Sequence, residues 1–369
     1  MQTIESFYHE ALKRATGQEE FEYDPEQLNC LFHPSIHEPV WGEEELSDEG
    51  KEKPLSKDSR AVLEDVLAGK KAGRKAYVLI APAFLGQYKD VKTGQIRNAF
   101  RKMGFDGLVE VALFADILTL KEALEFDRHI QSESDYVLTS CCCPMWVAMI
   151  KKTFQQLMPH VPPSVSPMIA AGRTVKKLYP DALTVFLGPC VAKKTEAKDP
   201  DLIGAIDHVL TFQECKDIFD RLGILPQDQS DKKRVYSSEA GRIYAYAGGV
   251  SKAVQMTLEQ LNPERAIKVR ALHANGVAEC RQMLNEIMKG EIKANFFEGM
   301  GCAGGCVGGP KKLIPQEAAK EHVKAYGKRS PYRTPLDNPY VLELLTRLGF
   351  YTLEGLLYDE TFFSRKRFS

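Results

Sequence analysis

The 369-residue sequence has no surplus of charge of either sign and no long apolar run. Lys and Arg together number 49 and Asp and Glu 50, so the formal net charge is -1. A nucleic-acid-binding surface normally needs a basic excess. No stretch reaches the roughly eighteen consecutive apolar residues that mark a membrane-spanning helix. We therefore expect a protein that binds no nucleic acid and has no membrane span.

The N-terminal residues also lack the plan of a secretory signal, in which a basic segment precedes an apolar one. Residues 1–20 have instead the pattern of an amphipathic helix. The length allows two or three domain-sized units or one large two-lobed domain. Hydrophobic residues make up 44%, which suits a chain with a sizeable core. A cytoplasmic location is the expectation that follows.

Cysteine is scarce outside three clusters. In a long cytosolic chain, clustered thiols are more often metal ligands or redox groups than disulfides. Three consecutive cysteines also suit disulfide geometry poorly. The nine cysteines are Cys30, Cys141, Cys142, Cys143, Cys190, Cys215, Cys280, Cys302 and Cys306.

From Lys75 onward, short apolar strands alternate with amphipathic helices, which predicts an α/β fold. We expect two lobes, each a mostly parallel sheet flanked by helices, with a cofactor in the cleft between them. The predicted strands are 76–80, 107–112, 136–139, 183–187, 269–274 and 295–297. The predicted helices are 94–103, 119–128, 213–222 and 277–289. The expected division is an N-terminal helical and loop extension (1–70), two lobes (about 71–180 and 181–325) and a closing C-terminal helical segment (326–369).

Each cysteine cluster follows a predicted strand, where open α/β sheets place their ligand sites. The clusters are Thr139-Ser-Cys-Cys-Cys-Pro144, Gly188-Pro-Cys190 and Met300-Gly-Cys-Ala-Gly-Gly-Cys306. The glycines of the last cluster let the backbone approach an inorganic cluster closely. Cys190, Cys302, Cys306 and one cysteine of the triple make four ligands, the number a [4Fe–4S] cluster takes. A structural zinc site is the alternative, but only one pair here has the short spacing of a zinc knuckle.

The three segments TSCCCPMW, GPCVAKKTE and EGMGCAGGCVGG resemble, in order and spacing, the signature loops of the [FeFe]-hydrogenases. The resemblance runs from about residue 70 to the C-terminus. It implies an H-cluster, a [4Fe–4S] cubane bridged through Cys306 to a diiron unit that carries CO, cyanide and azadithiolate. It also implies that Cys190 and Cys302 hold the cubane.

The first segment has one cysteine more than the family pattern. Alignment from Pro144 makes Cys143 the fourth cubane ligand and Cys142 the proton carrier, whereas alignment from Thr139 shifts both roles by one residue. We prefer the first alignment because the ligand then keeps its place before the proline. Cys141 is left without a role.

By the same resemblance, other side chains surround the diiron unit. Lys193 donates to a cyanide, and Met300 packs near the bridging CO. Pro82 and Ala83 line the distal iron. Two further residues, Pro167 and Met168, occupy a place where many relatives carry Pro-Gln, and Ser166 is counted with the cofactor-binding residues.

The proton route departs from the family pattern. Glu122 and Glu125, three apart on one predicted helix face, match its two carboxylates. The relay serine falls near Pro162-Pro163, so Ser164 or Ser166 would have to replace it. Glu196 offers a different exit.

Residues 1–80 contain only Cys30, which excludes an accessory cluster there. Electrons would then pass directly to or from a ferredoxin-like partner, and maturases would install the diiron unit. The resemblance implies interconversion of H2 with protons and electrons. Two alternatives stay open: a hydrogen sensor with slow turnover, and an electron-transfer or assembly protein that holds only a [4Fe–4S] cluster.

Overall fold

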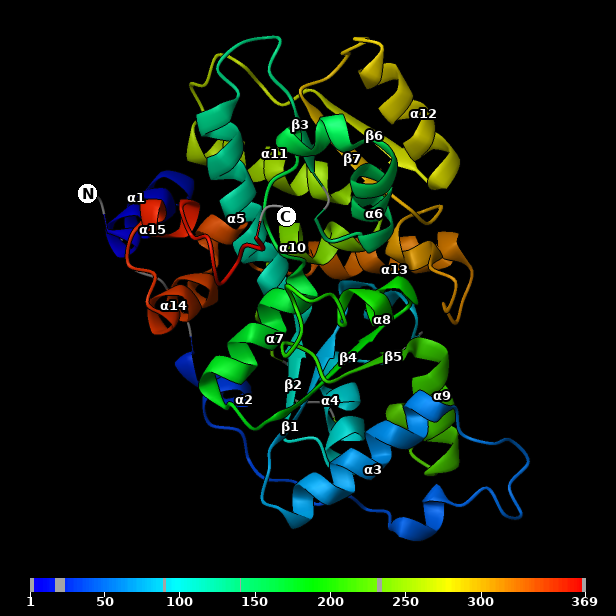
Figure 1. Ribbon diagram of the computed structural model, residues 1–369. Coiled ribbons are helices and arrows are strands. Elements are labelled where there is room, and N and C mark those ends of the chain that lie inside the picture. Colours follow the sequence, from blue (N-terminus) through cyan, green and yellow to red (C-terminus); the bar gives the residue numbers. More distant parts are fainter. Residues whose placement is uncertain (1–2, 17–23, 89–90, 140, 231–233, 367–369) are drawn as a thin grey trace.

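A computed structural model describes residues 3–16, 24–88, 91–139, 141–230 and 234–366 of the chain (Figure 1). The strands are β1 (Ala76–Ile80), β2 (Gly107–Glu110), β3 (Val137–Thr139), β4 (Leu183–Gly188), β5 (His208–Thr211), β6 (Ala271–Asn275) and β7 (Phe296–Met300). The helices are α1 (Ile4–Thr16), α2 (Asn29–Phe32), α3 (Lys57–Lys71), α4 (Thr93–Lys102), α5 (Val111–His129), α6 (Pro144–Thr153), α7 (Pro167–Leu178), α8 (Ala192–Glu196), α9 (Phe212–Arg221), α10 (Glu239–Arg242), α11 (Gly249–Leu261), α12 (Val277–Met288), α13 (Gln316–Lys328), α14 (Pro339–Leu348) and α15 (Leu353–Leu357).

The first sheet has the strand order β2-β1-β4-β5, and all its neighbours are parallel. Every residue of β1 and β4 is buried. Such continuous burial is typical of a parallel sheet with both faces covered, which explains why these strands read as unbroken apolar runs. Helices α3 and α9 pack against β4 and β5, and α7 packs against β1 and β4.

The second sheet has the order β3-β7-β6 and is also parallel. Successive side chains of β7 belong to separate cores, as the two-residue period of a strand requires. Phe297 lies in a cluster with Trp146 of α6 and Leu284 of α12. Phe296 packs instead with Phe126 of α5 and with α11.

The predicted α/β fold with parallel sheets is confirmed, but the strands do not follow the expected lobe boundary near residue 180. Strand β3 precedes that boundary and pairs with β7, and β4 follows it and pairs with β1. Parallel neighbours are joined by long crossovers, so a strand's position in the chain does not decide its sheet. Each sheet therefore takes strands from both halves.

The predicted strand 107–112 is too long. Strand β2 ends at Glu110, and Val111 begins the 19-residue helix α5, of which the predicted helix 119–128 is the second half. The first half of α5 is apolar except for Asp116, and it shows no helical period. All its sides are buried because the helix packs against helices of both sheets. Strand β5 was not predicted at all.

The chain ends pack onto the main core. Ile4 and Tyr8 of α1, in the N-terminal segment, are buried in the same core as β1 and α5. Helices α14 and α15 contact α5. Figure 1 shows the chain after α15 returning, in red, toward the middle of the molecule. In the part of the chain that the structure describes, no helix is long and apolar enough to cross a membrane.

Candidate metal centre

The three cysteine clusters follow β3, β4 and β7, and a fourth loop, which begins at Pro82, follows β1. Carboxyl ends of parallel strands meet at one edge of their sheet, so each sheet presents two of these loops. The short helix Pro82–Gly86 contacts the turn Cys306–Gly308, and α6 contacts α8. The loops of the two sheets therefore lie next to one another.

The cysteine thiols of these loops act on one another electrostatically. Burial and the neighbouring Cys190 and Cys143 raise the pKa of Cys302 to about 11. Burial and the same two cysteines also raise the pKa of Cys306. Burial raises the pKa of Cys190, although Lys193 acts against this shift. Four thiolates so close together repel one another unless a cation binds between them, and metal binding removes that cost.

The loop that carries Cys302 and Cys306 depends on glycine. Gly305 has φ +79°, and a Cβ there would lie 2.5 Å from the backbone nitrogen of Ala247. A side chain is therefore excluded both by conformation and by space. The N–H of Gly301 donates to the Sγ of Cys143 at 3.3 Å, which joins the first cysteine loop to the third.

Helix α6 holds the first loop in place. Cys143 is its N-cap and Pro144 its first residue, a position that suits proline because its missing N–H needs no partner there. The Trp146 indole Nε1–H donates to the carbonyl of Thr139 at 2.7 Å. Helix α6 therefore fixes Cys143 at its N-terminus, and the bond from Trp146 ties the residues before Cys143 to the same helix.

Lys193 lies one turn from Cys190 and is buried with Glu196. Its Nζ donates to Glu196 Oε2 at 2.7 Å, and the side chains are 8% and 4% exposed. Burial disfavours the ammonium, but Glu196, Cys190 and Cys142 outweigh it, so the pKa of Lys193 is raised. Arg365, which the sequence interpretation did not single out, lies with its guanidinium 3.7 Å from Glu196 Oε1.

The remaining predicted cofactor-binding residues lie on elements that bound this region. Ala83, Met168 and Met300 are buried in the main core. Pro82 begins a 3₁₀ helix, and Pro167 begins α7. Ser166 is fully buried, and its Oγ has no hydrogen-bond partner among the described residues. This hydroxyl is therefore available to bond a ligand group.

Cys141 and Cys142 face different surroundings. Burial and the adjacent Cys141, Cys306 and Cys143 raise the pKa of Cys142 well above its usual value, against the influence of Lys193. Cys141 donates from Sγ to Glu122 Oε1 at 3.3 Å. The sequence analysis gave Cys141 no role. The structure shows that Cys141 is bonded to Glu122 of α5.

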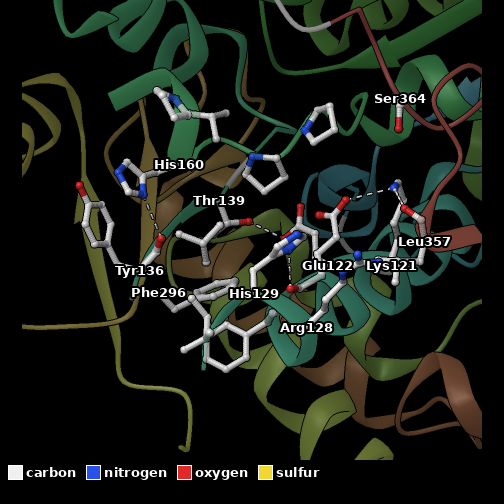
Figure 2. A pocket seen from close by; sticks show the side chains of 18 of the residues that line it. Lys121, Glu122, Arg128, His129, Tyr136, Thr139, His160, Phe296, Leu357 and Ser364 are labelled. Atoms are coloured by element: carbon white, nitrogen blue, oxygen red, sulfur yellow. Dashed lines mark hydrogen bonds and ion pairs between the residues drawn. The ribbon is translucent and has the colours of Figure 1, made fainter. Parts of the chain in front are cut away.

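Glu122 links this thiol to a cavity. Thr139 donates to its other oxygen, and Figure 2 shows the two side chains pointing toward one another. Burial, with smaller contributions from Glu125 and Glu298, raises the pKa of Glu122 to about 7, although the bonds from Thr139 and Cys141 act against the shift. A carboxyl with such a pKa exchanges protons readily near neutral pH.

The cavity beyond Glu122 has a volume of about 760 Å³. Its walls include Glu125, His129 and His160, together with Pro162 and Pro163, which lie near the position of the family's relay serine. Glu125 Oε1 accepts a bond from Lys121 at 3.0 Å, and Oε2 has no hydrogen-bond partner in the described chain. The cavity is large enough to hold water, and polar side chains such as Glu122, Glu125 and His129 form part of its wall.

The donor set suits a cluster better than one ion. Within the described ranges, no group of three or more His, Cys, Asp and Glu side chains is placed to hold a metal ion. A single zinc ion needs its four ligands about 2.0–2.3 Å from one point, whereas each iron of a cubane takes its own thiolate. Four cysteines on separate loops match the ligand number of a [4Fe–4S] cluster.

The chain matches the family described as iron only hydrogenase large subunit, C-terminal domain, over residues 74–310. It is 26% identical to iron hydrogenase 1 of Clostridium pasteurianum over 63% of this chain and 48% of that protein. It is 27% identical to the NADP-reducing hydrogenase subunit HndD of Solidesulfovibrio fructosivorans, over 68% of this chain and 52% of the relative. The chain thus spans about half the length of these two relatives.

Two other similarities bear on function and fold. The cytosolic iron-sulfur assembly component 3 of Pongo abelii is 23% identical over 68% of this chain and 64% of its own length. The solved structure of an [FeFe]-hydrogenase, HydA1 from Chlamydomonas reinhardtii, superposes with a TM-score of 0.66 at 22% identity, covering 81% of this chain and 97% of that one. The structural likeness concerns the fold alone.

Proposed function

The chain belongs to the iron-only hydrogenase family, and from that premise we propose that it interconverts H2 with protons and electrons at an H-cluster. Iron–sulfur chemistry is common to the family. When bound, the H-cluster supplies the site where H2 reacts and the path for its electrons. The observation that carries the proposal is the meeting of Cys143, Cys190, Cys302 and Cys306 beside the buried Lys193.

The four cysteines would hold the cubane, with Cys306 as the bridge to the diiron unit. Cys306 is influenced by Cys190, Cys143 and Cys302 together, which supports this set and the alignment that makes Cys143 the ligand. Lys193, a buried cation, suits an anionic ligand such as cyanide because charge-assisted hydrogen bonds are strong. Met300, Ala83, Pro82, Pro167, Met168 and Ser166 would line the diiron unit.

Protons would pass through two thiols. Cys142 lies near Cys306 and Lys193, and Cys141 donates to Glu122 at 3.3 Å. The route we propose runs from Cys142 to Cys141, then to Glu122 and into the cavity. Water in the cavity then takes the place of the relay serine that Pro162 and Pro163 cannot supply. Glu125, in the cavity wall, is the second carboxylate of this route.

Electrons would enter from a docked ferredoxin-like carrier. Met145 and Val191, close in sequence to Cys143 and Cys190, are each 43% exposed, and the cysteines themselves are partly exposed. An apolar surface beside a redox centre suits a transient partner. Dedicated maturases would install the diiron unit, and the reaction would take place in the cytoplasm.

A second candidate function is that of a [4Fe–4S] electron-transfer or assembly protein, which the likeness to the cytosolic assembly component supports. A third is a slow hydrogen sensor, which keeps the cofactor. Both differ from the leading proposal in a measurable way. The assembly protein has no CO or cyanide, and the sensor has both but turns over slowly.

The test is infrared spectroscopy and H2 evolution on protein loaded with the complete cofactor. Bands from iron-bound CO and cyanide, together with H2 evolution from a reduced dye, are expected. Protein that takes up the [4Fe–4S] cluster but shows no such bands after loading overturns the hydrogenase proposal in favour of the assembly function. Bands without appreciable turnover favour the sensor.

A further inference from the structure

The last described residues form a strap that crosses the start of α7. The N–H of Arg365 donates to the carbonyl of Pro163 at 2.8 Å, and the N–H of Val165 donates to the carbonyl of Phe363 at 2.9 Å. From α7, the guanidinium Nη1 of Arg173 donates to the carbonyls of Thr361, Phe362 and Ser364. The strap is therefore held on both sides of Phe363.

This strap carries Arg365 into the protein. Its side chain is 9% exposed, although Lys366 beside it is exposed. The guanidinium lies 3.7 Å from Glu196 Oε1, an atom that has no hydrogen-bond partner among the described residues. The other oxygen of Glu196 accepts the bond from Lys193. One buried carboxylate therefore stands between two cations.

We propose that Arg365 is a positioning residue that balances the charge of Glu196 and so leaves Lys193 free to bind an anionic ligand of the diiron unit. This inference rests on the proposed function and goes beyond it, because it concerns a residue outside the three cysteine loops. Arg365 also acts electrostatically on Cys141 of the first cysteine loop.

The charge balance gives the physical reason. A buried carboxylate that loses its only cation is strongly destabilised. Lys193 can keep its bond to Glu196 while another of its three N–H groups donates to a cyanide, but as the only cation it would then share one charge between two anions. Arginine stays charged at every relevant pH, and its several N–H groups can serve an oxygen that lacks a bond. At 3.7 Å, Arg365 is close enough to take over from Lys193.

The test compares Arg365→Gln with Lys366→Gln, which removes the same charge from the exposed neighbour on the same strap. Each apoprotein first receives its [4Fe–4S] cluster and is then titrated with a synthetic diiron complex that carries CO, cyanide and azadithiolate. Uptake is followed by the cyanide infrared bands. We expect Arg365→Gln to weaken uptake about tenfold or more, the effect of losing one charge-assisted hydrogen bond from Lys193 to a cyanide, and to shift the cyanide bands. Lys366→Gln should match the wild type, and Arg365→Lys should restore most of the uptake.

A double variant separates this role from a loss of folding. In Glu196→Gln/Arg365→Gln no buried carboxylate needs a cation, so uptake should recover to within about threefold of that of Glu196→Gln alone. Cyanide bands and uptake in Arg365→Gln that equal those of the wild type overturn the inference and leave the proposed function intact. No recovery in the double variant also overturns it, because the strap would then act only structurally. Wild-type protein without any bands overturns the proposed function and this inference with it.

Discussion

At the scale of single residues, Cys141 and Cys142 are chemically identical neighbours with different surroundings. Cys142 is close to Cys306 and Lys193, and Cys141 is bonded to Glu122. Adjacent side chains in a loop point apart, so one thiol can face the cofactor site and the next the proton exit. The extra cysteine of the first loop thus lengthens the proposed proton route by one thiol.

Cys142→Ala should abolish most turnover and leave the cofactor in place. Alanine cannot carry a proton, and loss of a proton-transfer group typically costs about 10²–10⁴-fold in rate. The measurement is H2 evolution alongside the CO and cyanide bands. Cys215→Ala is the control, since Cys215 is buried in α9 away from the cysteine loops. Full activity in Cys142→Ala would contradict the proposed relay.

The pKa of Glu122, about 7, predicts a pH dependence with a definite sign. As the pH rises through about 7, Glu122 loses its proton, so H2 evolution, which needs a proton donor, should fall. H2 oxidation, which needs an acceptor, should rise over the same interval. Rates in both directions from pH 5 to 9 provide the measurement.

Two variants check the assignment of that pH dependence. Glu122→Gln should remove it and slow both directions. Thr139→Val should shift it to higher pH, because the Thr139 hydroxyl bond holds the pKa of Glu122 down. An unchanged profile in Glu122→Gln would exclude Glu122 from the route.

At the scale of elements, the third cysteine loop contains a glycine in a backbone conformation that other residues rarely adopt. Gly305 and Gly290 have the same φ of +79°, but a Cβ at Gly290 would meet nothing within 4 Å. Alanine variants at these two glycines share the same backbone strain, and only the variant at Gly305 adds a steric conflict.

Gly305→Ala should therefore destabilise the protein by about 1–3 kcal/mol and lower its iron content, since Cys306 is the next residue. Gly290→Ala should cost only about 1 kcal/mol and keep its iron. Urea unfolding and iron analysis on the reconstituted proteins provide the measurement. Equal iron content in the two variants would show that the loop tolerates a side chain.

At the scale of the whole molecule, the four proposed ligands join the two sheets. Cys190 follows β4 of the first sheet, and the other three follow β3 and β7 of the second. A cluster bound by all four is a cross-link between the sheets, and binding to the native state alone adds to stability.

Anaerobic loading with iron and sulfide should therefore raise the melting temperature by about 5 °C or more. Cys190→Ser should lose most of that gain, whereas its unloaded melting temperature should stay close to that of the unloaded wild type. Calorimetry on both forms measures the difference. An equal gain in Cys190→Ser would mean that Cys190 does not hold the cluster.

The sequence by itself determined the α/β class and the family, because both depend on local patterns. Strand-sized apolar runs such as 76–80 and 183–187 reflect burial on both faces, and each cysteine loop follows its strand directly. The family confirmed by the comparisons was identified from three such loops. The assignment of ligands among those cysteines stays a prediction.

Only the tertiary structure decided which residues distant in the chain meet. The pairing of β3 with β7, the bond from Cys141 to Glu122 and the approach of Arg365 to Glu196 each join residues of different elements that lie far apart in the chain. Parallel pairing and buried polar contacts leave no periodic mark in a single sequence, because they depend on how helices and crossovers pack. For that reason the sequence was enough to predict an iron–sulfur cofactor. The proposed two-thiol route and the buried Lys193–Glu196–Arg365 group could be found only in the tertiary structure.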